Sequence, residues 1–341
     1  TVDLDGETYW GDATYISLER NGRRWNFDMD YYGISPTFRT DDGFNTRNDY
    51  RSISVWTGLW NRPNKKWITN WEPSISFGRN WKYDAKLDVT KYDRGAFDEW
   101  FRTEVYLETR MQTEISMNYL NSQENFFGEN FPGISRFNFY INSKFSEIAG
   151  IGFSLNTGTS IWRNRDNPDL GYNKNYEIWG TFKPTERLII TPSFYRSIMD
   201  RRNSYFEDIN HAGEPENIFD ASVLYTKMTY QFSRKLHLRL IVQYFNSDSY
   251  SFEEVEEING SDTTLVKKHI VDNFKNISIE PLLTYKINAF TKFYVGMSSN
   301  YDYVYPDSNP NMSERINHLS DPEYSLSNRQ FFAKFQYLFR M

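Results

Sequence analysis

The feature that most constrains this chain is a two-residue alternation of side-chain character in its last segment. Residues 331–341 read FFAKFQYLFRM. Every second residue from Phe331 to Met341 is apolar or aromatic, and the residues between them include Lys334, Gln336 and Arg340. Successive side chains of a β-strand point to opposite faces of the sheet. The segment is therefore predicted to be a strand with one aromatic face and one mostly polar face.

An aromatic strand face at the end of a chain is typical of an outer-membrane β-barrel, whose closing strand has one face in lipid. The segment resembles the C-terminal signal that directs the insertion of bacterial barrels. The predicted elements of that signal are Phe335, Tyr337, Phe339 and Met341. Such signals usually end on an aromatic residue, whereas this one ends on methionine. The alternative is an ordinary edge strand of a soluble β-sandwich.

Composition favours the barrel. Aromatic residues make up 18% of the chain although its mean hydropathy is −0.72. No run of 18 apolar residues occurs, so the sequence excludes a transmembrane helix. In a barrel only alternate strand residues meet lipid, and tyrosine and tryptophan form belts at the two interfaces. The net charge of −6 and the lack of a basic stripe argue against nucleic-acid binding. Because Thr1 is not an initiator, a targeting signal is expected to have been removed.

The same alternation recurs along the chain. Met111, Ile115 and Met117, for example, alternate with polar residues, which is a period of two rather than 3.6. The predicted strands are residues 24–35, 52–60, 67–77, 101–107, 111–120, 137–141, 147–156, 176–182, 188–198, 221–232, 236–245, 276–285, 289–299 and 331–341. Residues 9–20 form a fifteenth candidate, which either pairs with a strand further upstream or lies outside the wall.

The connections between these segments fall into two alternating classes. The short ones are residues 21–22, 62–65, 108–110, 142–144, 183–186, 233–235 and 286–288, and they carry turn residues. The long ones are residues 33–49, 84–96, 121–130, 157–175, 200–217, 246–273 and 300–328. Outer-membrane barrels place short turns on the periplasmic side and long loops outside. The predicted fold is all-β: a transmembrane antiparallel up-and-down outer-membrane β-barrel of about 14–16 strands. We expect one domain over residues 1–341, with residues 1–20 as part of an upstream strand or linker.

Two stretches resemble a known family. Residues 35–51, SPTFRTDDGFNTRNDYR, follow a strand that carries Asn21, Gly22 and Trp25, and residues 331–340 form the aromatic ending. Both are similar to an uncharacterised Bacteroidota outer-membrane β-barrel family that usually carries a carbohydrate-binding-module-like N-terminal domain. The resemblance implies a barrel in the outer membrane of a Gram-negative bacterium. That N-terminal β-sandwich does not occur in this sequence, and the family brings no established chemistry.

Residues suited to catalysis are sparse. The four histidines are His211, His237, His269 and His318, and no Ser/His/Asp or HExxH arrangement occurs. His237 is predicted to point inward beside Arg239 as a hydrogen-bonded residue. The Asp41-Asp42-Gly43 turn lacks the spaced acidic ligands of a dedicated calcium loop. We therefore expect neither an enzyme, nor a metal, nor a cofactor.

The strand faces opposite the apolar ones carry charges of both signs. The candidate lumen-lining residues are Arg24, Asp28, Asp30, Glu72, Arg102, Glu104, Glu114, Arg136, Glu177, Lys227, Arg239, Glu280, Lys292 and Lys334. A barrel of fourteen or more strands is too wide for side chains alone to fill. The charges could line a water-filled passage, or they could pair across strands and stiffen the wall. A further acidic run, residues 253–257, is expected in a solvated loop or bridged by divalent ions to lipopolysaccharide phosphates.

These patterns predict a passive channel or porin-like protein with a mixed-charge lumen. The alternative is a non-enzymatic membrane anchor, or an accessory subunit of an envelope complex, with a closed lumen. A surface enzyme is a more distant third reading. The expected partners are outer-membrane lipid and lipopolysaccharide, the barrel assembly machinery during insertion, and an envelope protein, but no nucleic acid.

Overall fold

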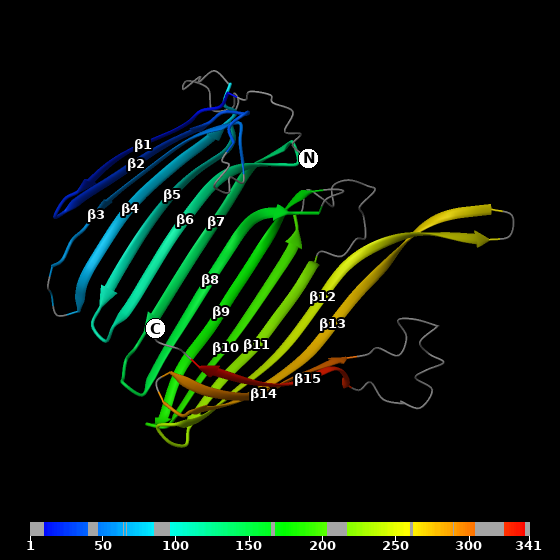
Figure 1. Ribbon diagram of the computed structural model, residues 1–341. Helices are drawn as coiled ribbons and strands as arrows, with labels where there is room; N and C mark the ends of the chain where they lie inside the picture. Colours follow the sequence, from blue (N-terminus) through cyan, green and yellow to red (C-terminus); the bar gives the residue numbers. More distant parts are fainter. Residues whose placement is uncertain are drawn as a thin grey trace. The chain divides into compact units, whose positions relative to one another are not determined.

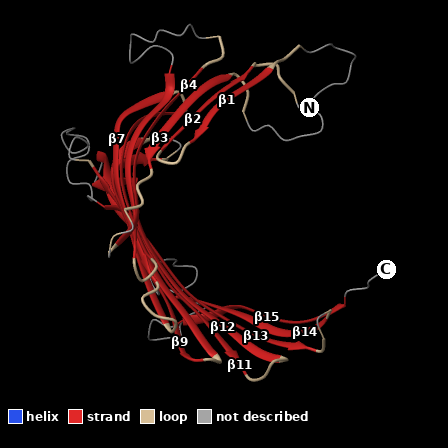
Figure 2. Cartoon of the chain, turned by 90° about the vertical axis from the view of Figure 1, so that its left-hand side faces the viewer, coloured by secondary structure: helices blue, strands red, loops and turns tan. Residues whose placement is uncertain are grey.

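The structure is a computed structural model that describes most of the chain. The described residues are 10–39, 47–63, 65, 67–84, 96–164, 168–202, 217–259, 262–288, 290–303 and 324–337. Within them every long element is a strand (Figure 2). The strands are β1 (Ala13–Asn21), β2 (Trp25–Ile34), β3 (Tyr50–Leu59), β4 (Ile68–Trp81), β5 (Ala96–Thr109), β6 (Thr113–Phe126), β7 (Glu129–Ser143), β8 (Ala149–Trp162), β9 (Asp169–Thr185), β10 (Leu188–Arg201), β11 (Asn217–Gln231), β12 (Leu236–Asn259), β13 (Asp262–Lys286), β14 (Thr291–Tyr303) and β15 (Tyr324–Tyr337).

The strands form one sheet in which the order in space is the order in sequence (Figure 1). Strand pairs such as β1–β2, β11–β12 and β14–β15 are antiparallel. The predicted all-β, up-and-down architecture is confirmed, and its fifteen strands lie within the expected range. Each predicted segment overlaps one strand. Strand β1 covers most of residues 9–20 and pairs with β2, so the reading that places this segment outside the sheet is wrong.

Short turns close the hairpins as the sequence predicts, because side-chain oxygens satisfy their free amides. The Asn288 Oδ1 atom accepts hydrogen bonds from the amides of Phe290 and Thr291, at 2.9 and 2.8 Å. The Ser233 Oγ atom accepts them from Lys235 and Leu236, at 3.2 and 3.1 Å. Asparagine and serine favour turns through such local bonds.

Several strands run further than the sequence predicts, and this shortens several of the expected long loops. Strands β12 and β13 continue through residues 246–273 as a paired hairpin, with Glu253 opposite Lys268 and Glu254 opposite Lys267. The expectation that the acidic run lies in a loop is therefore wrong. Strands β6 and β7 approach each other within residues 121–130, where Phe127 and Gly128 turn with φ of 51° and 89°. Strands β8 and β9 likewise cover much of residues 157–175. Backbone pairing satisfies N–H and C=O groups whatever the side chains are, so polar stretches without a clear alternation also form strands.

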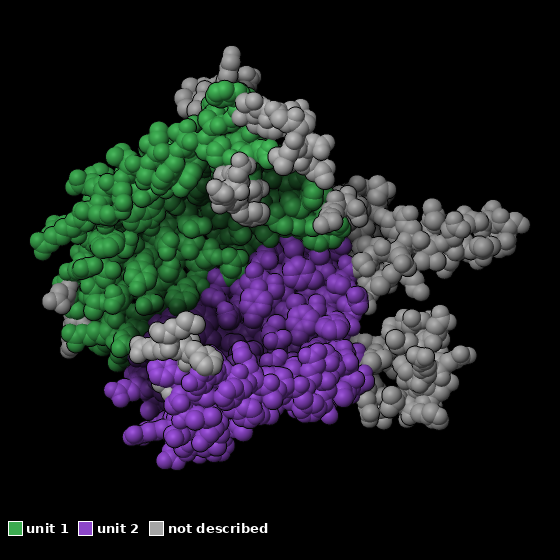
Figure 3. Space-filling model, in the orientation of Figure 1, with its two compact units in different colours: residues 1–140, 156–171 green, residues 141–155, 172–341 purple. Residues whose placement is uncertain are grey.

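The chain divides into two compact units (Figure 3). Unit 1 comprises residues 1–140 and 156–171, and unit 2 comprises residues 141–155 and 172–341. In each unit an aromatic ring covers a strand glycine. A Cβ atom on Gly78 would lie 1.9 Å from the Trp100 ring, and one on Gly152 would lie 2.1 Å from the Trp179 ring. Both positions therefore require glycine, and the ring shields the exposed backbone.

Within the described residues there is no helix of the length and apolar character needed to cross a membrane.

Candidate functional site: a charged strand face and a polar margin

In unit 2 the strand register places the predicted charged residues on one face, which we call the polar face of unit 2. Ile241 lies between Lys227 on β11 and Glu280 on β13, and residues directly opposite each other share a face. Arg239 lies two residues before Ile241 and shares that face. The register from β13 through β14 to β15 extends the polar face of unit 2. Its predicted members are Glu177, Lys227, Arg239, Glu280, Lys292 and Lys334.

Glu177 joins this set through a side-chain contact between β9 and β10. Ser197 Oγ donates a hydrogen bond to Asn175 Oδ1 at 2.6 Å, so these two side chains share a face. Ser197 is opposite Ala221 on β11, six residues before Lys227. Glu177 lies two residues after Asn175 and therefore shares the face as well.

Unit 1 carries a corresponding face, the polar face of unit 1. Glu104 lies between Ser74 and Asn118, and Ser116 Oγ donates a hydrogen bond to Glu104 Oε1 at 3.0 Å. Asn138 Nδ2 donates to Asn118 Oδ1 at 2.7 Å, which brings β7 into the same face. Its predicted members are Asp28, Asp30, Glu72, Arg102, Glu104, Glu114 and Arg136. Carboxylates predominate among these candidates, whereas basic residues predominate among those of unit 2.

Arg24 is the exception among the predicted residues. Strand β2 begins at Trp25, and Arg24 lies in the exposed turn after β1. Its carbonyl accepts a hydrogen bond from the Trp60 amide at 2.7 Å. This bond continues the pairing of Trp25 with Leu59 by one residue, and the assignment of Arg24 to the lumen stays a prediction.

The charged candidates on the two polar faces are not paired with one another. The ion pairs among the described residues are Arg47–Asp98, Arg79–Glu99, Arg163–Glu124, Lys174–Asp200 and Arg196–Asp220, and none contains a candidate. The Nε atoms of Arg136 and Arg239 have no hydrogen-bond partner within the described part of the chain. The reading in which these residues stiffen the wall by cross-strand ion pairs therefore finds no support in the described residues.

The opposite side of each unit is apolar. In unit 2, Leu238 lies opposite Leu283, and Leu283 lies opposite Val295, so three neighbouring strands contribute to one apolar face. In unit 1, Phe77 lies between Val55 and Phe101. The register also places Ile115, Leu238, Leu240, Ile279 and Phe293 on the apolar side of their units. Phe335 and Tyr337 are on the apolar side of β15, whereas Phe339 and Met341 lie outside the described residues.

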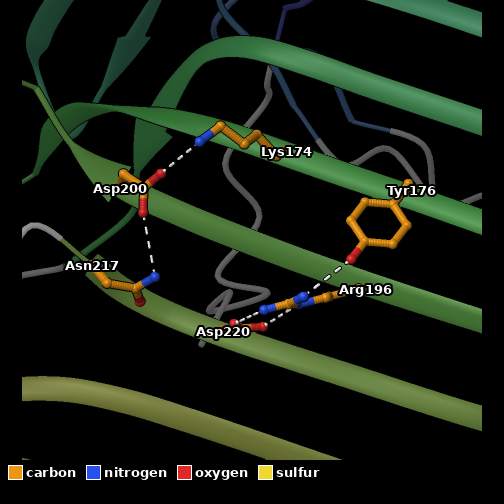
Figure 4. Close-up of polar contacts among 6 residues, drawn as sticks. All are labelled: Lys174, Tyr176, Arg196, Asp200, Asn217 and Asp220. Atoms are coloured by element: carbon orange, nitrogen blue, oxygen red, sulfur yellow. Dashed lines mark hydrogen bonds and ion pairs between the residues drawn. The ribbon is translucent and has the colours of Figure 1, made fainter.

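A network of charged side chains interrupts the apolar face of unit 2 where β10 ends and β11 begins (Figure 4). Arg196 donates from Nε to Asp220 Oδ1 at 2.9 Å, and from Nη1 to the Tyr176 hydroxyl at 3.2 Å. Lys174 Nζ lies 3.1 Å from Asp200 Oδ2. Asn217 donates from Nδ2 to Asp200 Oδ1 at 3.3 Å. We call these six residues the polar margin of unit 2.

An apolar groove of about 210 Å³ adjoins this margin on the same strands. It is lined by Ile151, Ile178, Trp179, Gly180, Phe182, Pro192, Ser193, Phe194 and Leu224. Gly180 leaves the space open, because a Cβ atom there would lie 2.7 Å from the Phe182 ring. The Phe194 ring lies 6.2 Å from the Tyr176 ring, so the groove continues directly into the margin.

Unit 1 shows a simpler version of this arrangement. Arg79 and Glu99 form an ion pair on its apolar side, next to a groove of about 330 Å³ lined in part by Ile53, Phe77 and Phe101. Beyond the end of β4, the hydrogen bond from the Tyr83 hydroxyl to Asp12 raises the pKa of Tyr83. Charged groups thus occupy the apolar side close to a strand end in both units.

The sequence pattern did not identify the polar margin of unit 2 or the Arg79–Glu99 ion pair of unit 1. The alternation assigns Arg196 to the same face of β10 as Phe194. It likewise assigns Asp220 to the same face of β11 as Leu224. The available signal is a charged residue in the apolar phase within a few residues of a long connection.

The histidines show no catalytic arrangement within the described residues. His237 lies opposite Gln231 and Thr284, on the polar face of unit 2, as predicted. His269 belongs to β13 rather than to a loop. His211 and His318, like Asp41-Asp42-Gly43, lie outside the described residues. Among the residues that the structure describes, no group of three or more His, Asp or Glu side chains is placed to hold a metal ion.

The chain is similar to solved structures of one outer-membrane protein. It resembles OmpT of Vibrio cholerae, folded in vitro, in its trimer form, with 9% identity, a TM-score of 0.38, and coverage of 96% of this chain and 99% of that one. A second structure of OmpT gives 8% identity, a TM-score of 0.34 and coverage of 87% and 86%. An OmpT variant that lacks loop L8 gives 9% identity, a TM-score of 0.34, and coverage of 86% of this chain and 92% of that one. No family model and no curated protein matches the chain.

Proposed function

We propose that this chain is an outer-membrane β-barrel that acts as a passive, porin-like channel. In this proposal the sheet closes into a barrel, the apolar faces meet lipid, and the polar faces line the lumen. Only helices and closed barrels satisfy every backbone hydrogen bond in a bilayer, and the described spans are strands. The segregation of Leu238, Leu283 and Val295 from Lys227 and Glu280 fits an apolar exterior around a polar interior.

The absence of ion pairs among the charged candidates is the observation that carries the channel function. A charge away from bulk water must be paired or hydrated. Glu104 and Glu280, like Arg136 and Arg239, form no ion pair with another described residue. Apart from the hydrogen bond that Glu104 accepts from Ser116, we infer that water stabilises these charges. A hydrated, charged wall is what a passive aqueous channel needs.

The location and the partners follow from the same proposal. An apolar exterior with aromatic strand ends suits the outer membrane of a Gram-negative bacterium, where the chain would contact lipid and lipopolysaccharide. Phe335 and Tyr337 lie on the apolar side of β15, which supports a role in recognition by the barrel assembly machinery. Kinship with the Bacteroidota barrel family, and contact with an envelope protein, belong to the proposal as well. We expect no enzymatic activity and no binding of nucleic acid.

Conductance measurements test the channel. The purified protein, reconstituted in a planar bilayer in 1 M KCl, is expected to give steady, discrete open steps with weak ion selectivity, because the polar faces carry both signs of charge. A properly inserted protein that gives no steps would reject the channel in favour of a closed membrane anchor. Insertion is checked by the faster migration of the compact, unboiled barrel on electrophoresis, which is lost on heating.

A further inference from the structure

We propose that the groove and the polar margin of unit 2 together form a binding site for one glycolipid of the outer leaflet. One acyl chain would lie in the groove, and the sugar headgroup would contact the margin. This inference rests on the proposed membrane location, but not on conduction.

The groove supplies the apolar half of the site. Ile178 and Phe182 flank Gly180 on β9, while Phe194 and Leu224 lie opposite each other on β10 and β11. Leu224 is 48% exposed, so the groove opens at the surface of the apolar face. A recess with apolar walls of this kind fits an alkyl chain better than a flat strand surface, because the chain gains contacts on several sides.

The polar margin begins where the groove ends. Arg196 lies two residues after Phe194 on β10, which is a rise of about 7 Å. Tyr176 connects the two halves, since its ring lies 6.2 Å from that of Phe194 and its hydroxyl accepts a hydrogen bond from Arg196. A ligand in this place must therefore be amphipathic, with its polar part towards the connection between β10 and β11.

The charge balance of the margin favours sugar hydroxyls over a phosphate. Lys174 and Arg196 each have a carboxylate partner, Asp200 and Asp220, so the four formal charges cancel. A site that binds a phosphate by charge would present unpaired cations. A balanced network instead offers donors and acceptors side by side, and each sugar hydroxyl both donates and accepts hydrogen bonds. The side chains of Lys174 and Arg196 are 56% and 39% exposed, so they are accessible to a headgroup.

Two detergents with the same alkyl chain test this preference. Protein purified in a polyoxyethylene detergent would be titrated with dodecyl maltoside or with dodecyl phosphate, and bound molecules counted by native mass spectrometry. We expect the tightest-bound maltoside to occupy the protein at a concentration about tenfold lower than the phosphate. Equal or tighter binding of dodecyl phosphate would overturn the proposal.

Two substitutions locate the site. Leu224→Trp fills the groove and is expected to lower the number of tightly bound maltoside molecules by one. Leu240→Trp places the same side chain elsewhere on the apolar face, beside Met228 and Pro281, and should leave that number unchanged. If both variants bind like the parent protein, the groove is not the site. Loss of binding in both variants would also overturn the assignment.

A third variant tests the role of charge balance. Asp220→Asn leaves Arg196 without its carboxylate, and we expect tighter binding of dodecyl phosphate together with weaker binding of the maltoside. No change in the order of preference would show that the margin does not select the headgroup. Conductance of the same preparation separates the two proposals. If the protein conducts but Leu224→Trp does not change maltoside binding, the channel proposal stands and the glycolipid site is rejected. If the protein does not conduct but binds maltoside as expected, the channel is rejected and the glycolipid site stands.

Discussion

At the scale of single residues, neighbours on one strand meet opposite environments. Leu240 lies opposite Met228 and Pro281, whereas Ile241 lies opposite Lys227 and Glu280. Since successive side chains alternate between faces, the same substitution at these two positions has different consequences for an inserted barrel.

Substitution of each of these two residues by arginine tests which environment its side chain meets. Leu240→Arg is expected to destabilise the inserted protein by about 2–4 kcal/mol if the residue lies near the bilayer midplane. Ile241→Arg should cost much less, because water and Glu280 are available on its side. Reversible urea unfolding in lipid vesicles gives both free energies. Equal costs at the two positions would contradict the assignment of the faces.

Residue placement was predictable from the sequence wherever the two-residue period held. Glu104 and Lys227 share their faces with the other candidates because alternation is a property of the extended backbone and needs no tertiary contact. The start of β2 one residue after Arg24 could not be predicted, because a strand end depends on its partner strand as well as on the alternation. The pairs of Arg196 with Asp220 and of Arg79 with Glu99 could not be predicted, since each joins residues on different strands whose register is unknown beforehand.

At the scale of elements, the β12–β13 hairpin consists of two parts. Residues 236–249 of β12 pair with β13 and also with β11. From Tyr250 to the tip, within the described residues, the two strands pair only with each other. A membrane-spanning strand needs about 9–11 residues, so the first part alone is long enough to cross a bilayer.

A shortened hairpin tests this division. Residues 250–271 would be replaced by an Asn-Gly turn between Ser249 and Asp272, which are paired in the register. We expect insertion and heat-modifiable migration to be retained. As a matched control, deletion of residues 242–245 with their partners 276–279 removes pairing shared with β11 and should abolish both. Loss of folding in the first variant would show that the distal strands are part of the stable sheet.

Element boundaries were less predictable than element identity. Each segment with a clear alternation became a strand, but the mostly polar stretch 246–273 has no sustained alternation to detect. It forms strands through backbone pairing in the register that the preceding part of the hairpin sets.

At the scale of the whole molecule, the two units differ in the charge of their polar faces. The predicted candidates of unit 1 include Glu104 and Glu114 among a majority of carboxylates, and those of unit 2 include Arg239 and Lys292 among a majority of cations. Fixed charges attract counter-ions over about 10 Å at 0.1 M salt and much less at 1 M. Ion selectivity should therefore respond in opposite directions to changes in the two units.

Two double variants form a sign-matched pair. Neutralising Glu104 and Glu114 to glutamine should shift the potassium-to-chloride permeability ratio towards chloride by about two- to fivefold. Neutralising Arg239 and Lys292 to glutamine should shift it towards potassium by a similar factor. Reversal potentials across a tenfold KCl gradient give the ratio, and both shifts should shrink as the salt is raised. Shifts of the same sign, or none at low salt, would contradict a lumen lined by these faces.

The distal part of the β12–β13 hairpin has a consequence for how the protein behaves among its neighbours. Within the described residues, these distal strands pair only with each other, so each leaves an outer row of backbone N–H and C=O groups. Such open rows are templates for adding a strand from another chain, and natural proteins discourage this with charged residues. The sequence places Glu253, Glu254, Lys267 and Lys268 in this stretch. Replacing these four by threonine, which keeps the strand propensity and removes the charges, should turn a soluble micellar preparation into one that self-associates through this hairpin, visible as growth in light scattering.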